Sequence, residues 1–556
     1  MVSSKDKLTK KSVGEAYMDI LADNKEKFNK DKLGLIMQVG SFYEMYGIIK
    51  NDGTRIGNLW EMADLLNLKV AAKETKVEGG KLYMAGVPEA NIQKYLQTIV
   101  ERFGWTIVIY EQVKRGNTNT YDRVETAIYS PGINIDSSDS TNICMTIILE
   151  QISNKFNLQN KSMVNNKQDK ISVGIAFVDS LTGNNGVFDV GTHNMKDTAI
   201  PFDEILKFLT IKKPAELIIH CMNLDISDQS LIDSLHLFKF NHKIIRDELD
   251  IKFEKGSYQR ELLETVYVKH KGITNIVQQL ELDDINLMTS RNALCVLLEY
   301  IQKHDKSVIQ RLNKPDIIKN NNEFLMLANN CLEQLDIIDV QKKDLDNSFE
   351  SGLGKRVCLY QLLNKCKTTM GCHLFKERLS NPITNIEQLQ SRYQLNEELI
   401  LTEQNYSVSS TDKFGSPMYK IRDVLTQIKN VDNYFRKFVI QKINPYEVSP
   451  LIESLNFGLD LSCLLKQITK QNSNTSKYTQ INNLIPSNKL TETIERLITQ
   501  VNETMIHSNC PRIWVELENN FFKEGVFKEL DELQRDIDTD RNFVDELVYQ
   551  LSKIKK

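Results

Sequence analysis

Residues 39–47 read VGSFYEMYG and directly follow an apolar run that begins at Leu33 and has the composition of a buried β-strand. Within this stretch Phe42 and Glu44 stand two residues apart. Successive side chains of an extended segment leave on opposite faces, so Phe42 and Glu44 share one face and Tyr43 points to the other. The pattern therefore predicts a strand that presents an apolar ring and a carboxylate side by side, with Tyr43 as a packing residue.

This pair of side chains suits contact with nucleic acid. An apolar ring can wedge between the bases of a duplex step, and a carboxylate can accept a hydrogen bond from a base edge. Taken alone, the pair has a simpler interpretation as a core phenylalanine beside a solvated glutamate, because most such residues have no role beyond folding. The functional interpretation of Phe42 and Glu44 therefore depends on companion motifs farther along the chain.

Three such motifs occur in order: MAGVP at residues 84–88, EQV at 111–113 and SPG at 130–132. With GSFYE before them, they resemble the N-terminal mismatch-binding domain of the MutS family of DNA mismatch repair proteins. The resemblance implies that the ring of Phe42 stacks on the mispaired base from the minor groove and that Glu44 hydrogen-bonds the base.

The resemblance adds two further candidates for DNA contact. It places Lys73 near the DNA backbone, although an exposed lysine without a role is an equally good interpretation, because surface lysines are common. For Met84 the preferred expectation is that it packs behind the probe, the loop and strand that carry Phe42 and Glu44. The second expectation is that it touches DNA. Gly86 and Pro88 are expected to shape the turn before the next helix.

Length and composition predict a soluble, folded protein of three or four domains. The chain has 556 residues, of which 41% are hydrophobic and 26% charged. It has no run of 18 apolar residues and starts MVSSKDKLTKK, so we expect neither a membrane span nor secretion. The nine cysteines form no CxxC pair, which favours reduced thiols in an intracellular protein and predicts no metal site. Cytoplasm, nucleus, organelle and virus factory fit equally well.

The charge is unusual for a DNA-binding protein, which is expected to carry a basic surface. The net charge is −4, and residues 1–130 hold 19 Lys and Arg against 17 Asp and Glu. This balance fits a probe that reads local DNA shape while other parts, or a partner subunit, supply the phosphate contacts.

The alternation of apolar residues predicts two α/β domains followed by an all-α region. Residues 171–177 and 187–190 read as the two strands of a hairpin, and residues 214–219 as a strand after a helix. This second domain resembles the MutS connector, which has an RNase-H-like fold. The predicted boundaries are 1–135 for the mismatch-binding domain, 136–170 for a linker that contains one apolar strand, 171–265 for the connector, 266–520 for the helical core and lever, and 521–556 for the start of the clamp.

Two helical patterns stand out in the second half. Apolar residues from Leu359 to Leu374 have the spacing of one helix. From Leu530 to Ile554 they form a heptad stripe, which requires a partner helix. In the family this stripe begins the clamp, so the resemblance implies the N-terminal half of a longer protein. We expect this segment to fray or self-associate, and the chain to bind duplex DNA weakly.

The resemblance assigns ATP hydrolysis to a part of the family's proteins beyond these residues. Residues 352–355 read GLGK, but Phe349 and Arg356 stand where a phosphate-binding loop needs Gly and Ser or Thr. We therefore predict that this chain is not an enzyme and binds no cofactor. The full-length family member would be a DNA-dependent ATPase that uses ATP and Mg²⁺ as a homodimer or heterodimer on mismatched double-stranded DNA.

Two other functions compete with mismatch recognition. A MutS-derived interaction scaffold without ATPase activity would bind partners through the connector. A nuclease would use the RNase-H-like unit, but Asp179 has only Asp189 and Glu204 as nearby acidic candidates, and metal-dependent cleavage needs three or four converging carboxylates. A capping role in the turn DSLTG explains Asp179.

Overall fold

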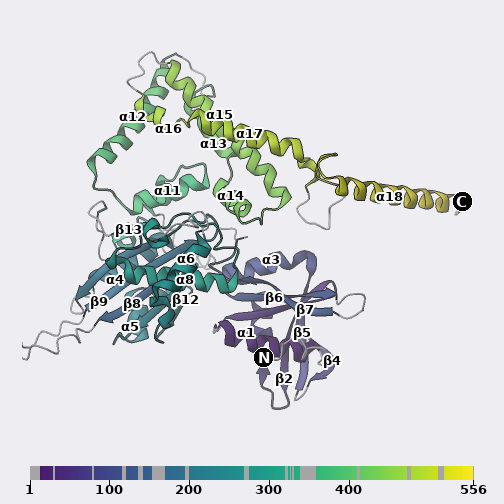
Figure 1. The fold of residues 1–556 in the computed structure, drawn as a ribbon. Helices are drawn as coiled ribbons and strands as arrows, with labels where there is room; N and C mark the ends of the chain where they lie inside the picture. Colours follow the sequence, from purple (N-terminus) through teal and green to yellow (C-terminus); the bar gives the residue numbers. More distant parts are fainter. Residues whose placement is uncertain are drawn as a thin grey trace, which may run out of the picture. The chain divides into compact units, whose positions relative to one another are not determined.

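The protein is described by a computed structural model that divides into two compact units. The first covers residues 1–321, 327–331 and 340–346, and the second covers residues 322–326, 332–339 and 347–556 (Figure 1). The structure describes residues 13–554 apart from 29, 31, 78–79, 115–120, 136–141, 153–169, 195–198, 268–274, 320–323, 326, 328–330, 339–357, 410–413, 472–477 and 511–518.

A seven-stranded mixed sheet with three helices opens the first unit. The strand order is β4-β5-β2-β1-β6-β7, with β3 paired to β2; β1 and β6 run parallel, and the other pairs are antiparallel. The elements are α1 (Val13–Phe28), β1 (Leu33–Val39), β2 (Phe42–Lys50), β3 (Arg55–Ile56), α2 (Leu59–Leu65), β4 (Ala71–Val77), β5 (Gly80–Pro88), α3 (Ile92–Gln97), a π-helical turn (Thr98–Arg102), β6 (Thr106–Lys114) and β7 (Tyr121–Tyr129).

The tight turn between β1 and β2 sets the register of the predicted probe strand. Val39 pairs with Phe42, so the turn consists of Gly40 and Ser41. Gly40 has φ +62°, a conformation that is unfavourable for residues with a side chain. The turn thereby fixes which face of β2 each subsequent side chain occupies.

Each face of this sheet carries its own apolar core, because the strands alternate. Tyr43 and Met45 of β2 pack with α2 and α3 on one face. Tyr46 and Ile48 pack with α1 on the other. Phe42 and Glu44 lie on the α1 face, because they are four and two residues from Tyr46 along the strand.

A second mixed sheet belongs to the same unit. Its strand order is β12-β11-β8-β9-β10-β13; β8, β9 and β10 form an antiparallel meander, and β11, β12 and β13 add in parallel. The elements are β8 (Ile143–Ile152), β9 (Lys170–Asp179), β10 (Asn185–Asn194), α4 (Ala199–Lys212), β11 (Glu216–Met222), α5 (Asp228–Ser234), β12 (His242–Ile245), α6 (Gly256–Val266), α7 (Ile276–Gln279), α8 (Met288–His304) and β13 (Asp316–Lys319).

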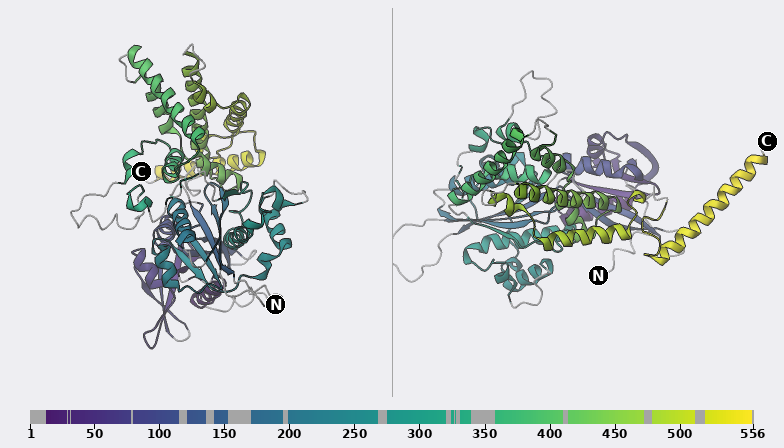
Figure 2. Two further views of the ribbon diagram at one scale, coloured as in Figure 1. Left: turned by 90° about the vertical axis from the view of Figure 1, so that its left-hand side faces the viewer. Right: turned by 90° about the horizontal axis from the view of Figure 1, so that it is seen from above.

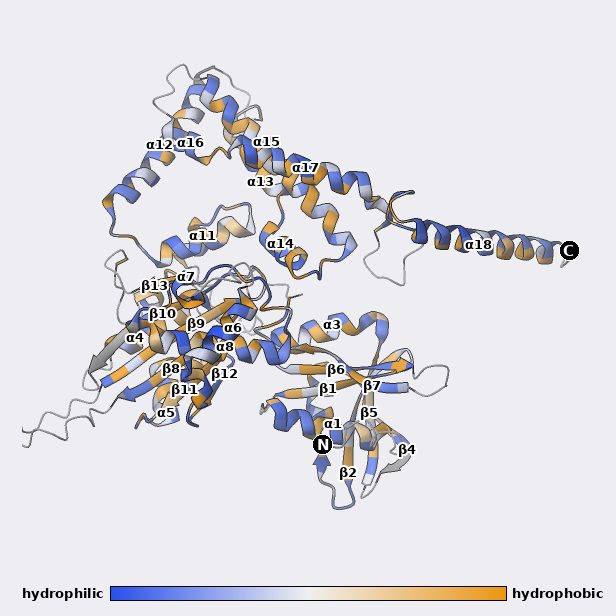
Figure 3. Cartoon of the chain, in the orientation of Figure 1, coloured by the Kyte–Doolittle hydropathy of each residue, from blue (hydrophilic) through white to orange (hydrophobic). Residues whose placement is uncertain are grey.

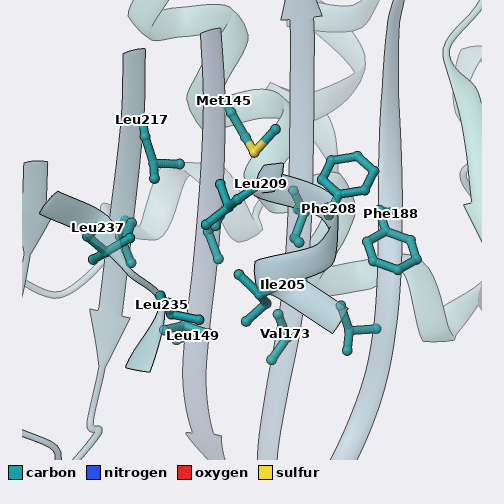
Figure 4. Packing of buried hydrophobic residues seen from close by; sticks show 14 of the residues in the cluster. Met145, Leu149, Val173, Phe188, Ile205, Phe208, Leu209, Leu217, Leu235 and Leu237 are labelled. Carbon is teal, nitrogen blue, oxygen red and sulfur yellow. The ribbon is translucent and has the colours of Figure 1, made fainter. Parts of the chain in front are cut away.

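One face of the second sheet is covered by α4 and α5 (Figure 4). Ile205 and Leu209 of α4 lie fully buried over Met145 and Val173 of the central strands. Helix α8 is fastened to the sheet by other residues: Ser172 Oγ and Thr289 Oγ1 lie 2.8 Å apart, and Ser290 Oγ donates to the carbonyl of Phe188 at 3.1 Å. A mixed sheet with helices packed on it is the α/β architecture predicted for the connector.

The structure moves two predicted boundaries of this domain. The range 136–170 was predicted to be a linker, but β8 lies within it and forms the centre of the sheet, paired with β9 and β11. The polar residues on either side of β8 produced the linker interpretation. The helical region was predicted to begin at residue 266, but α8 and β13 belong to the first unit.

The second unit is helical. Side-chain caps start several of its helices: Thr368 accepts from the backbone N–H of Gly371, and Ser416 from that of Tyr419, with Pro417 directly after the cap. The helices are α9 (Cys331–Gln334), α10 (Leu359–Leu363), α11 (Thr369–Ser380), α12 (Ile386–Ser409), α13 (Pro417–Gln427), α14 (Val431–Val439), α15 (Pro445–Gln471), α16 (Thr479–Leu484), α17 (Asn488–Thr504) and α18 (Lys528–Ile554).

The helix predicted from Leu359 to Leu374 was wrong as a single element. The structure divides it into α10 and α11. Between them Asn364 Oδ1 accepts from the backbone N–H of Cys366 at 3.0 Å, and the cap at Thr368 starts a new helix. Polar side chains that bond to nearby backbone groups end helices in this way although the apolar spacing continues.

Helix α15 is the one described helix that is long and apolar enough, by length and composition, to cross a membrane. It packs against α13, α14, α16 and α17, and Leu465 and Ile468 lie in an apolar cluster with α12 and α16. The buried Glu447 in its first turn pairs with Lys437 of α14 at 2.6 Å. These contacts are those of a central helix within a helical unit.

Helix α18 is one continuous helix (Figure 2), as the heptad stripe predicted. Its start is held by hydrogen bonds from the backbone N–H groups of Gly525 to Asp531 and of Asn520 to Gln534, both at 2.8 Å. Its apolar residues, which lie between hydrophilic ones (Figure 3), are strongly exposed; Leu533, for example, is 57% exposed and Leu551 62%.

Candidate nucleic-acid interface

Phe42 occupies the first position of β2, directly after the turn. In the sheet register it lies between Val39 of β1 and Pro88 of β5. Its side chain is 47% exposed. A large apolar ring at this exposure beside a tight turn is accessible to a binding partner.

Glu44 lies on the same face as Phe42 but is buried, with only 8% of its surface exposed. Its Oε2 atom accepts a hydrogen bond from the Tyr46 hydroxyl and another from Lys73 Nζ at 2.9 Å. Burial and the bond to Glu44 raise the pKa of Tyr46, so the phenol keeps its proton and acts as the donor.

Lys73 reaches this site from β4, where the pairing with β5 shifts register between Ala72 and Lys76. Its Nζ lies 3.1 Å from the Tyr46 hydroxyl and 4.9 Å from the centroid of the Tyr46 ring. The Lys73 side chain remains 34% exposed. The structure thus brings Lys73 into contact with Glu44, as a partner of the carboxylate.

The MAGVP motif forms the end of the neighbouring strand β5. Pro88 caps the 3₁₀ turn Glu89–Asn91 that leads into α3, as expected, whereas Gly86 lies within the strand. Gly86 lies opposite Glu44, and a Cβ added at Gly86 would come within 3.3 Å of Glu44 Cγ. Met84 lies opposite Tyr46 and packs against the apolar cluster under α1. Met84 therefore has a packing position, which was the preferred expectation over contact with DNA. Glycine at residue 86 leaves room for the carboxylate.

The EQV motif supports the probe strand from both faces of the sheet. Glu111 accepts a hydrogen bond from the Tyr43 hydroxyl at 2.9 Å on the face covered by α2 and α3, where Tyr43 is 5% exposed. Gln112 accepts from the backbone N–H of Gly40 in the turn at 3.1 Å. These bonds hold the turn beside Phe42 in place. Tyr43 is a packing residue, as its strand position predicts.

Two residues of the site were not identified from the sequence. Tyr46 was overlooked although its spacing of two from Glu44 places it on the same face. Arg123 of β7 donates to the carbonyl of Gln38 and lies close enough to Glu44 to interact electrostatically. Its position could not be read from local sequence, because β7 reaches β2 only through β6 and β1.

The candidate metal position in the second sheet is a turn cap. Asp179 accepts hydrogen bonds from the backbone N–H groups of Asn142 and Leu181 at 3.0 and 3.1 Å and from the hydroxyl of Thr182 at 2.8 Å. Burial raises the pKa of the Asp179 carboxyl. Across the described ranges, no group of three potential metal ligands occurs. The geometry of Asp179 thus fits the capping interpretation.

Fold and site together define a modular protein in which an α/β domain presents an aromatic residue and a carboxylate, and a second α/β domain and a helical region come after it. Residues 23–138 match the family model of MutS domain I, and residues 330–553 match that of MutS domain III, together more than half of the chain. The chain belongs to the MutS family.

Curated relatives agree with this assignment. A putative DNA mismatch repair protein, a mutS homolog of Acanthamoeba polyphaga mimivirus, is 25% identical over 96% of this chain and 46% of its own length. The DNA mismatch repair proteins MutS of Caldanaerobacter subterraneus and Methanosarcina mazei are 23% and 22% identical over 78% and 90% of this chain and 41% and 49% of their own lengths. The chain spans about half the length of the curated relatives that it matches.

Proposed function

We propose that this chain recognises mispaired duplex DNA by inserting the ring of Phe42 beside the mispair while Glu44 hydrogen-bonds the displaced base. The observation that carries the proposal is the pairing of a 47% exposed ring with a fixed carboxylate on one face of a sheet. Inserting a side chain between bases and bending the duplex costs less where base pairing is already weak. That difference in cost would be the source of selectivity.

The two side chains have different roles in this proposal. The ring of Phe42 supplies stacking, which is tolerant of base identity because every base has a π-face. Glu44 discriminates, because a carboxylate near phosphates is repelled unless a base offers it a donor. Met84 packs beneath the site and supports it without a role in base recognition.

The charges of the site suit the recognition of one base pair better than tight binding to the DNA backbone. Among the described residues around Glu44, the cations are Lys73 and Arg123, and Lys73 is paired with the carboxylate. Affinity for duplex DNA depends mainly on neutralised phosphates. We therefore expect weak binding overall, with a preference that depends on the mispair.

For the whole protein we propose ATP-dependent mismatch repair with Mg²⁺ and assembly as a homodimer or heterodimer, on the strength of the family resemblance. These residues contain no GxxxxGK[ST] sequence. ATP hydrolysis stimulated by mispaired duplex, together with sedimentation of the full-length protein, would test this part.

The experiment that tests the recognition step is a binding comparison at low salt, where phosphate contacts are least screened. The chain is titrated into a duplex with a central G·T mispair and into the matched duplex, each with 2-aminopurine beside the central pair. We expect tighter binding and a larger rise in 2-aminopurine fluorescence with the mispaired duplex. Equal affinity and equal fluorescence for both would contradict the proposal and favour an interaction scaffold.

A further inference from the structure

Among the described residues, the donors that hold the carboxylate of Glu44 bond to one and the same oxygen. Both the Tyr46 hydroxyl and Lys73 Nζ bond to Oε2. Within the part of the chain that the structure describes, Oε1 accepts no hydrogen bond. A carboxylate can accept at both oxygens, so Glu44 retains acceptor capacity in a fixed direction.

The two partners of Glu44 differ in how firmly they are held. The ring of Tyr46 is fully buried and packs edge-on against Tyr17 of α1, with ring centroids 5.3 Å apart. Lys73 is one-third exposed and extends from a strand whose pairing is irregular. Tyr46 is therefore fixed by the core, whereas Lys73 is free to exchange its partner.

We propose that Tyr46 is a positioning residue for base recognition and that Lys73 is a charge partner that sets the affinity for duplex DNA, an inference that rests on the proposed function. The Tyr46 hydroxyl holds Oε2 so that Oε1 faces the base. The Lys73 ammonium balances the negative charge of Glu44 as the phosphates approach. Tyr46 thereby sets selectivity for the mispair, and Lys73 sets affinity for duplex DNA of any pairing.

A purely structural role for Tyr46 makes a different prediction. A buried phenol needs an acceptor, and Glu44 would serve as one without any consequence for DNA. Removing the hydroxyl would then lower thermal stability but leave the ratio of affinities for mispaired and matched duplex unchanged. The ratio therefore separates the two roles.

The test compares Tyr46→Phe with Tyr267→Phe as a matched control. Tyr267 is also buried, and its hydroxyl donates to Asn185 Oδ1 at 2.6 Å in the second α/β domain, away from Glu44. We expect Tyr46→Phe to lower the mispaired-to-matched affinity ratio by about 3- to 10-fold, the loss of one orienting hydrogen bond. Tyr267→Phe should leave the ratio unchanged. An unchanged ratio in Tyr46→Phe, with a lowered ratio in Glu44→Gln, would overturn the assignment.

Lys73→Met tests the second half of the proposal. We expect it to weaken binding to both duplexes by the same factor and to reduce the slope of log affinity against log salt by about 1, the effect of one lost phosphate contact. A lowered ratio at an unchanged salt slope would mean that Lys73 acts on base recognition instead, and would overturn its assigned role.

A DNA-free measurement keeps this inference distinct from the proposed function. Tyr46→Phe should lower the melting temperature of the wild-type chain and have little further effect in a Glu44→Gln background, because the bond it removes is already weakened there. Equal losses in both backgrounds would refute the Tyr46–Glu44 contact. A wild-type chain without any mispair preference would instead overturn the proposed function, whatever this thermal comparison shows.

Discussion

Two of the buried glutamates in the first unit, Glu44 and Glu216, are bonded by the same kinds of side chain and yet occupy different settings. Glu44 is bonded by Tyr46 and Lys73. Glu216 is bonded by Tyr300 and by Lys30, whose Nζ lies 2.7 Å from Oε1. The types of partner therefore do not tell the two sites apart.

The two sites differ in how many oxygens of each carboxylate accept hydrogen bonds. Both oxygens of Glu216 are occupied: Lys30 and Tyr300 bond to Oε1, and the Ser130 hydroxyl and the Gly132 backbone N–H bond to Oε2. Lys30 itself is only 12% exposed, against 34% for Lys73.

These bonds join the two sheets of the first unit. Lys30 and Ser130 flank strands of the first sheet, whereas Glu216 begins β11 and Tyr300 lies on α8. Burial alone would raise the pKa of the Glu216 carboxyl, but Lys30, His304 and the hydrogen bonds outweigh it and lower the pKa to about 2. Glu216, whose two oxygens both accept hydrogen bonds, stabilises the fold. Glu44, which within the described residues has a free acceptor oxygen beside the exposed ring of Phe42, is available to a ligand.

The largest expected effect is on stability at Glu216. Glu216→Gln leaves Lys30 buried without a counter-charge, and breaking one side of a buried pair costs ~3–5 kcal/mol. Glu44→Gln should cost under ~1 kcal/mol, because Lys73 can reach water. Urea unfolding measures both losses when it is followed by the fluorescence of Trp60 on α2 and of Trp105, which directly precedes β6. Equal losses of unfolding free energy in the two variants would contradict the difference proposed between the two sites.

The second effect is on recognition at Phe42. Phe42→Ala should remove the preference for a mispaired over a matched duplex, a loss of ~1–3 kcal/mol or about 5- to 150-fold, without changing stability. Phe238→Ala is the matched control, because Phe238 is 60% exposed in the second α/β domain and lies outside the site. If Phe42→Ala discriminates as well as the parent chain in competition binding, the assignment of Phe42 fails.

The third effect is a pH dependence near Glu216. Burial, and then the charge of Lys30, lower the pKa of His304 from 6.5 to about 4. In the unfolded chain the His304 imidazole binds a proton below pH 6.5, whereas in the folded chain it stays neutral down to about pH 4. The free energy of unfolding therefore falls as the pH falls through this window. Between pH 6.5 and 4.5 the loss from His304 amounts to about 2 kcal/mol.

His304→Gln isolates this contribution, because every other titrating group is retained. The wild-type chain should lose about 2 kcal/mol more than this variant between pH 6.5 and 4.5. Parallel stability curves for the two chains would show that His304 is not held neutral by its surroundings. Glu216, whose pKa is already depressed to about 2, should keep its contribution throughout this window.

The fourth effect is the role of Glu44 in discrimination. Glu44→Ala removes a negative charge near the phosphates, so affinity for matched duplex should rise relative to mispaired duplex by roughly 1 kcal/mol. Parallel titrations of the two duplexes measure this change. Equal weakening on both would show that Glu44 tightens binding without selecting.

The smallest effect concerns the part of α18 from Arg535 to Lys553, where the side chains are exposed. Beyond Arg535, which lies 3.6 Å from Glu524, the helix presents exposed apolar residues such as Val544 and Leu547. Helices without tertiary packing are marginal in water, so the amides of residues 538–554 should show little protection in hydrogen exchange, or protection that increases with protein concentration. Strong protection in a monodisperse monomer would contradict this expectation.

The sequence by itself determined the local features of this protein. The alternation in residues 39–47 placed Phe42 and Glu44 on one face and Tyr43 on the other, and the structure agrees. The hairpin that joins β9 and β10 and the continuous helix α18 were predicted from spacing alone. Such features depend on neighbours within a few residues, so strand and helix periodicity is enough to predict them.

Only the tertiary structure decided which distant residues meet. The central position of β8 depends on its pairing with β9 and β11, and the polar segments beside it suggested a linker. Lys73 reaches Glu44 across 29 residues, and Lys30 reaches Glu216 across 186. Contacts at such separations depend on sheet register and on packing between domains, and no local pattern encodes either one. The sequence therefore identified Glu44 as a candidate for base recognition, and the fold determined which side chains hold it.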